Sequence, residues 1–266
     1  MHITITGNLG SGKSTICRLL NEKYGFEIYS TGKIQRELAR QMNMTTLELN
    51  QLMCSDKKYD KMIDDETARI SRENREKDII FDSRLAWHFV EHSFKVFVSV
   101  SLDVAAKRVM NDQRGSEERY ASLEEAKNLL AQRAATERVR YKDIYNLNYM
   151  DFDNYNLVID STYSSPDLIA WIILHEAKEF YKDNEEYGAT KLLVSPAMLI
   201  NPDDISEADK ERLQPLVESY KDLEYKIDDL IPARKTEEAY ELIDGIDKVK
   251  AAFLAKVPYV QIKAEK

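Results

Sequence analysis

Short apolar runs alternate with longer amphipathic stretches over the first 182 residues of the chain. The runs at 2–6, 26–29, 78–81, 95–100 and 156–160 have the length and the β-branched or aromatic residues of strands. Polar stretches with apolar positions at helical spacing predict helices between them, at 13–24, 33–41, 59–74, 103–111, 122–145 and 166–181. Strands that alternate with helices favour a five-stranded parallel sheet covered by helices on both faces, which is an α/β fold.

A second series of apolar and amphipathic segments follows the charged stretch 182–186. It predicts strands at 191–194, 240–243 and 257–262, and helices at about 206–220 and 246–255. This order is typical of a small α+β unit. We therefore expect two domains, one at 1–182 and one at 191–266.

The segment between the first strand and the first helix carries a phosphate-binding motif. Residues 7–14 read GNLGSGKS and match G-x-x-x-x-G-K-[ST] in the strand, loop and helix context that this motif requires. In such a loop, backbone N–H groups and the helix N-terminus attract phosphate, the lysine reaches the β and γ phosphates, and the serine holds Mg²⁺. The residues expected to bind ATP are Gly7, Gly10, Ser11, Gly12, Lys13, Ser14 and Thr15.

Two polar residues stand where other predicted strands end. Asp82 ends the third strand, and Ser30 follows the second. Because the carboxyl ends of parallel strands meet at one edge of a sheet, both should lie near the phosphate loop. A carboxylate there can hold Mg²⁺ directly or through water, so Ser14 and Asp82 are the expected metal ligands. The alternative for Asp82 is a structural role in capping a turn.

Arginines are placed where phosphate-rich substrates would need them. Guanidinium groups suit phosphoryl transfer because they align phosphates and neutralise the charge that spreads over their oxygens. An arginine on a helix can equally pair with a surface carboxylate, so the group is more informative than any member. Its members are Arg36, Arg84, Arg108, Arg114, Arg133, Arg138 and Arg140.

The composition limits the possible partners. The chain has 38 Lys and Arg against 47 Asp and Glu, a net charge of −9, which disfavours binding of nucleic acid through bulk electrostatics. No stretch approaches the roughly 18 apolar residues of a membrane span. We therefore expect a soluble, cytoplasmic protein with no membrane contact.

Four blocks of the sequence resemble the cytidylate kinases, especially the short archaeal-type branch. They are residues 30–39, 81–87, 133–145 and 155–161, and they occur in the order seen in that family. The resemblance covers residues 1–182. It implies a P-loop nucleoside monophosphate kinase that uses ATP and Mg²⁺ to phosphorylate CMP or dCMP.

The resemblance also implies roles on the acceptor side of the site. Arg36, Arg84 and Arg140 would grip the phosphate of the acceptor nucleotide, and Glu137 would face its sugar. Ser30, which opens the first of the four blocks, would also contact the acceptor.

On the donor side, the resemblance gives catalytic roles to Lys13, Asp82 and Arg133. Arg133 would reach the transferring phosphoryl group from a mobile lid, and Arg108 would lie near the adenine of ATP. Closure of the lid would exclude water and prevent hydrolysis of ATP.

Two departures from the family pattern concern the acceptor. Lys33 adds a positive charge there, and Ser83 replaces a glycine that lets phosphate approach the backbone. Two alternatives therefore stay open: a kinase of a hydroxyl acceptor, such as a hydroxymethylated pyrimidine in DNA, and a regulatory ATP-binding module. The acidic composition counts against DNA, and a pure ATP switch has no need for the acceptor-side arginines.

The C-terminal unit resembles the ParB/sulfiredoxin family. Residues 240–252 are similar to that family's strand, Asp-Gly turn and helix. Ile246, Asp247 and Lys248 stand where His-His-Arg is expected, so the resemblance does not imply hydrolysis or nuclease activity. We expect a module for packing or homodimerisation, or a part in acceptor recognition.

Overall fold

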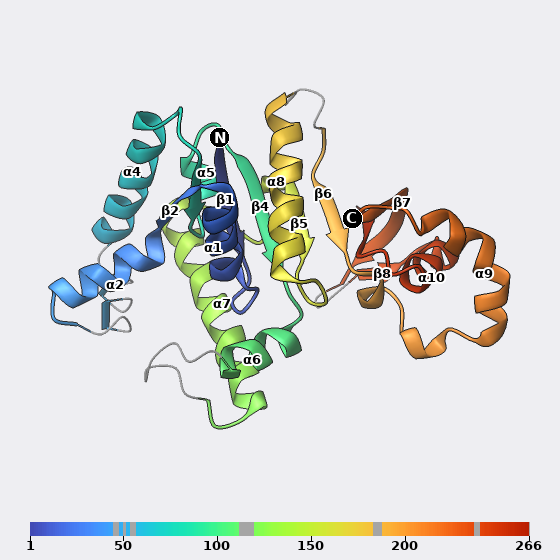
Figure 1. Ribbon diagram of the computed structural model, residues 1–266. Helices are drawn as coiled ribbons and strands as arrows, with labels where there is room; N and C mark the ends of the chain where they lie inside the picture. Colours follow the sequence, from blue (N-terminus) through green and yellow to red (C-terminus); the bar gives the residue numbers. More distant parts are fainter. Residues whose placement is uncertain are drawn as a thin grey trace.

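The computed structural model describes residues 1–44, 48–49, 52–53, 57–111, 120–182, 188–236 and 240–265, with the backbone alone for residues 33 and 36. Among these residues, nine strands form one continuous sheet (Figure 1). The strands are β1 (His2–Gly7), β2 (Glu27–Ser30), β3 (Ile79–Asp82), β4 (Phe94–Ser99), β5 (Leu157–Asp160), β6 (Lys191–Val194), β7 (Lys226–Lys235), β8 (Tyr240–Leu242) and β9 (Tyr259–Glu265).

Helices connect most of these strands. They are α1 (Lys13–Tyr24), α2 (Thr31–Gln41), α4 (Lys58–Glu73), α5 (Ala86–Phe89), α6 (Leu102–Asn111), α7 (Leu123–Tyr145), α8 (Pro166–Lys182), α9 (Glu207–Tyr220) and α10 (Ile246–Leu254). Short 3-10 turns occur at Phe152–Asn154, Pro196–Met198 and Pro202–Asp204. No helix in the described part of the chain is long and apolar enough to cross a bilayer.

The five predicted strands of the N-terminal part are confirmed, and all are parallel. Their order is β2-β3-β1-β4-β5, so β1 lies between β3 and β4. A parallel sheet whose strand order reverses around a central strand binds ligands at the carboxyl ends of its strands. Ile5 pairs with Asp82, and Asp82 pairs with Ser30, so the ends of β1, β2 and β3 meet at one edge.

Helices cover both faces of this parallel sheet, as predicted. Figure 1 shows α1 and α8 together on one face, where Leu20 and Ile173 share a buried cluster with Ile5 of β1. Phe97 of β4 belongs to a cluster on the other face with Tyr141 of α7. Burial of apolar side chains on both faces is what holds a parallel sheet and its crossover helices together.

The sheet does not end at β5. β6 pairs parallel to β5, β9 antiparallel to β6, β7 parallel to β9, and β8 antiparallel to β7. The predicted strands at 191–194, 240–243 and 257–262 are therefore present, but they extend the N-terminal sheet. β7 is an additional strand that the sequence pattern does not predict. Figure 1 shows α9 and α10 at the opposite end of the sheet from α2 and α4.

Two buried polar contacts attach this extension to the N-terminal part. Glu176 of α8 is only 1% exposed, and it accepts from Lys191 Nζ at 2.6 Å and from the Tyr225 hydroxyl at 2.6 Å. The Tyr259 hydroxyl donates to the Asp160 carbonyl oxygen at 2.8 Å. The division into domains at 182 and 191 and the ParB-like character of residues 191–266 stay predictions.

Candidate active site

The glycine-rich loop follows the carboxyl end of β1, as the motif predicts. Gly12 immediately precedes α1 and has φ 84°, a left-handed conformation that favours glycine. Gly7 lies against β4, because a Cβ atom there would stand 2.2 Å from the Val98 carbonyl oxygen. The first N–H groups of α1 have no partner within the helix, so this end of the loop attracts anions.

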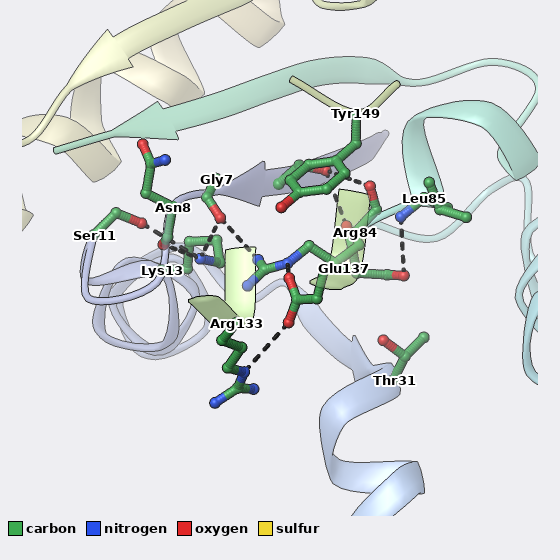
Figure 2. Close-up of polar contacts among 12 residues, drawn as sticks. Gly7, Asn8, Ser11, Lys13, Thr31, Arg84, Leu85, Arg133, Glu137 and Tyr149 are labelled. Carbon is green, nitrogen blue, oxygen red and sulfur yellow. Dashed lines mark hydrogen bonds and ion pairs between the residues drawn. The ribbon is translucent and has the colours of Figure 1, made fainter. Parts of the chain in front are cut away.

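Lys13 folds back over the loop (Figure 2). Its Nζ donates to the carbonyl oxygens of Gly7 at 3.0 Å and Asn8 at 2.7 Å, and to the Ser11 hydroxyl at 3.4 Å. Burial, and after it the nearby Arg84 guanidinium, lower the pKa of Lys13 to about 7. The amine therefore sits among oxygen atoms of the loop with a much lower proton affinity than an exposed lysine.

Arg84 joins the phosphate loop to α7. It lies in the turn between β3 and α5, and it donates to the Gly7 carbonyl oxygen and to Glu137, each at 2.8 Å. Glu137 also accepts from Arg133 Nε at 3.3 Å, which completes the chain of contacts in Figure 2. Burial opposes ionisation of Glu137, but Arg84, Arg133 and Lys13 together lower its pKa. Glu137 is thus an anion that holds arginines against the loop.

Asp82 occupies the predicted place at the end of β3. Its Oδ2 accepts from the Ser30 hydroxyl at 3.1 Å, and its carbonyl oxygen accepts from the Thr31 hydroxyl at 3.5 Å. Ser14 is exposed in the first turn of α1. Mg²⁺ keeps several waters, takes phosphate oxygens and needs only one or two protein ligands, so a hydroxyl and a carboxylate fit its donor preference. The described residues hold no cluster of three or more His, Cys, Asp or Glu that could bind a metal.

Arg108 lies at the outer side of the loop. It donates to the carbonyl oxygens of Ser161 at 2.6 Å and Gly10 at 3.4 Å, and to the Ser161 hydroxyl at 3.1 Å. Burial lowers the pKa of Arg108. The residue therefore links the end of β5 to the phosphate loop.

The structure also brings together a buried polar cluster that the sequence analysis does not predict. Arg140 of α7 donates to Asp60 Oδ1 at 2.7 Å, and the Tyr145 hydroxyl donates to Asp64 Oδ2 at 2.5 Å. Both carboxylates are on α4, one turn apart. The available signal was their spacing, because they share the helix face that carries the buried Ile63.

Most of the predicted site residues meet at the carboxyl edge of the sheet. The phosphate loop, Arg84, Glu137 and Arg133 form one connected group, and Asp82 contacts Ser30. Arg140 stands apart from this chain of contacts, in the cluster with Asp60. Only the backbone of Arg36 is described, and residue 114 lies outside the described residues. The individual roles of all these residues stay predictions.

A separate cavity of about 500 Å³ lies away from this edge. Its lining includes His92, Lys95, Asn156 and Thr190, near the amino ends of β4, β5 and β6, and none of the predicted site residues. It is therefore not part of the candidate active site.

Known proteins resemble the part of the chain that contains this site. A cytidylate kinase of Natronomonas pharaonis is 34% identical over 188 residues, which are 70% of this chain and 94% of that enzyme. A cytidylate kinase of Methanobrevibacter smithii is 34% identical over 178 residues, 67% of this chain and 99% of the other. The model of the cytidylate kinase-like family matches residues 2–163. With the phosphate loop, the parallel sheet and these matches in agreement, the chain belongs to the cytidylate kinase-like family.

Proposed function

We propose that this protein transfers the γ-phosphoryl group of ATP to CMP or dCMP in the presence of Mg²⁺. The observation that carries the proposal is the position of Arg84. This guanidinium comes from outside the phosphate loop, yet it contacts the loop at Gly7 and is held there by the largely buried Glu137. A protein that only binds ATP has no need for a second set of cations at the loop, whereas phosphoryl transfer between two nucleotides does.

Binding of the donor phosphates is assigned to the loop and to α1. The N–H groups at the start of α1 and the glycine-rich backbone would cradle the β and γ phosphates. Lys13 would exchange its bonds to the Gly7 and Asn8 carbonyl oxygens for bonds to phosphate. Arg108, already bonded to Gly10 and Ser161, would flank the adenine.

The acceptor is assigned to the side of the loop formed by β2, β3 and α7. Arg84 would bind its phosphate together with Arg36 and Arg140, while Glu137 would lie by the sugar and Ser30 would complete the site. Arg133 is half exposed and bonds to Glu137, so it would approach the transferring group from the solvent side of α7. Bidentate guanidinium contacts fix both position and orientation of a phosphate, which is the main requirement of this reaction.

Magnesium would be held by the Ser14 hydroxyl and the Asp82 carboxylate. When bound, the ion neutralises charge on the donor phosphates. The hydrogen bond from Ser30 to Asp82 Oδ2 fixes the orientation of that carboxylate.

The decisive assay measures ADP release from ATP and Mg²⁺ with CMP, dCMP, UMP, dTMP, AMP and GMP in turn, and with duplex DNA that carries hydroxymethylated pyrimidines. Strong stimulation by CMP or dCMP supports the proposal. Phosphate transfer to the DNA alone would reassign the site to a hydroxyl acceptor, and no stimulation by any acceptor would favour a regulatory ATP-binding module.

For residues 191–266 we expect a packing role. The support is that Val217 of α9, Ala252 of α10 and Ile262 of β9 belong to the same buried cluster as Phe97 of β4. The resemblance to ParB/sulfiredoxin domains and the formation of a homodimer stay predictions. Sedimentation equilibrium of the full chain measures the oligomeric state directly.

A further inference from the structure

Two buried carboxylates of α4 face α7 beside the candidate active site. Asp60 and Asp64 are 5% and 7% exposed. Two side chains of α7 donate hydrogen bonds to these carboxylates. Arg140 donates to one oxygen of Asp60, and Tyr145 donates to one oxygen of Asp64. A buried carboxylate is costly unless its oxygens accept hydrogen bonds, so the arrangement needs a reason.

The second oxygen of Asp60 has no such bond. Its Oδ2 atom is buried and has no hydrogen-bond partner among the residues that the structure describes. An unsatisfied buried acceptor of this kind destabilises the folded state, and more so when it is charged. Asp60 is therefore ready to accept a hydrogen bond from a ligand.

A narrow pocket leads to this carboxylate. Among the described residues, its polar lining includes Thr31, Gln35, Asp60, Asp64 and Ser83, and Tyr141 and two aliphatic side chains also line it. The pocket volume of about 20 Å³ is enough for a group of the size of one water molecule. An exocyclic amino group at the edge of a base has that size.

The pocket lies on the acceptor side of the site. Thr31 follows Ser30, and its hydroxyl contacts the Asp82 carbonyl oxygen, while Ser83 precedes Arg84. A nucleotide whose phosphate is bound by Arg84 would therefore direct its base toward α2 and α4. Among the described residues, the lining of this pocket includes neither Arg108 nor Gly10 from the donor side.

We propose that Asp60 recognises the base of the acceptor nucleotide by accepting a hydrogen bond from the amino group of cytosine. This inference rests on the proposed function. Cytosine presents an N–H₂ donor where uracil presents a carbonyl oxygen. A carboxylate oxygen attracts the first and repels the second, so Asp60 selects cytosine nucleotides.

The neighbours of Asp60 act as positioning residues. Arg140 occupies one carboxylate oxygen and leaves the other for a group that enters the pocket lined by Asp60. Burial raises the pKa of Asp64 to about 7, and the nearby Asp60 charge acts in the same direction, against the Tyr145 hydrogen bond. This raised pKa favours the protonated form of the Asp64 carboxyl. The protonated form provides an O–H donor that matches the N3 acceptor next to the amino group.

The first test uses the wild-type enzyme and three acceptors: CMP, UMP and the ribonucleotide of 2-pyrimidinone, which is CMP without its amino group. We expect kcat/KM to be about 10- to 100-fold higher for CMP than for the 2-pyrimidinone nucleotide, the range for a hydrogen bond to a charged group. Equal use of these two acceptors would overturn the inference. Because no substitution is involved, this result does not depend on the folding of a variant.

The second test compares Asp60→Asn with the matched control Asp65→Asn. Asp65 is on the same helix but exposed, so the control makes the same change of charge away from the pocket. Asp60→Asn should lower the ratio of kcat/KM for CMP over UMP by at least about tenfold, with the KM for ATP unchanged, because the new amide N–H₂ faces a donor. The control should keep the wild-type ratio.

The outcomes separate the inference from the proposed function. A wild-type enzyme that phosphorylates no nucleoside monophosphate refutes both. An active enzyme whose Asp60→Asn variant keeps the wild-type ratio, or loses CMP and UMP activity equally, refutes the inference alone. If thermal unfolding shows that Asp60→Asn is not folded, the comparison of CMP with the 2-pyrimidinone nucleotide decides.

Discussion

The low pKa of Lys13 makes proton uptake a measurable part of ATP binding. In the free protein, burial lowers this pKa from 10.5 to about 7. At pH 8 about 90% of the Lys13 side chains are then neutral. Phosphate oxygens next to the amine favour its charged form and raise the pKa again. Binding must therefore take up a proton at any pH between the two pKa values.

The number of protons taken up follows from the pKa of Lys13 in the free protein. At pH 8 the binding of each ATP should take up about 0.9 proton at Lys13, because about 90% of the amines must gain one. The affinity for ATP should fall as the pH rises above 7, by up to about tenfold per pH unit for one linked proton. Below pH 6 Lys13 is already charged, and this uptake disappears.

Calorimetric titration with ATP and Mg²⁺ in buffers of different ionisation enthalpy measures the number of protons directly. The titrations belong between pH 7.5 and 9, where the terminal phosphate of ATP is deprotonated. Lys13→Met, which has no titrating group, and Lys13→Arg, which stays charged, are the matched controls and should both show no uptake at this site. No uptake by the wild type at pH 8, or the same uptake by Lys13→Met, would refute this account of Lys13.

Three further substitutions test other contacts. Arg84→Ala should raise the KM for the acceptor by about 10- to 100-fold while ATP binding, measured by calorimetry, persists; loss of ATP affinity alone would contradict the assignment. Glu137→Gln should lower the free energy of unfolding by about 3 kcal/mol, because it leaves the nearly buried Arg84 without its ion-pair partner; urea denaturation measures this, and a change below 0.5 kcal/mol would contradict it. Glu176→Gln should cost about 1–3 kcal/mol in the same assay because of its bonds to Lys191 and Tyr225. Its control Glu179→Gln, on the exposed side of α8, should change stability by less than about 0.5 kcal/mol.

Local signals predicted the parallel sheet and the phosphate loop. The five strands show short alternating or apolar patterns rich in β-branched and aromatic residues, and the motif at 7–14 specifies both the loop and the start of α1. β7 could not be predicted because its own residues give no local strand signal. Its residues Lys226–Lys235 include Asp228, Asp229 and Pro232, which are uncommon in strands, and they are held extended by pairing with β9.

The buried polar cluster of Asp60, Asp64, Arg140 and Tyr145 could not be predicted from the sequence either. Asp60 and Arg140 are 80 residues apart, and they meet only because α4 and α7 pack against each other. Sequence periodicity identifies both helices but not which of their faces come together. The role of Arg140 predicted from the family resemblance therefore could not include Asp60 as its partner.

The continuation of the sheet has a consequence for the solubility of the catalytic part. β5 is bonded on one side to β4 and on the other to β6, and its four residues are at most 4% exposed. A chain that ended after α8 would leave the backbone groups of β5 unpaired along a flat apolar edge. Unpaired strand edges can pair with other chains, and here the pairing of β6 with β5 closes such an edge within the same chain.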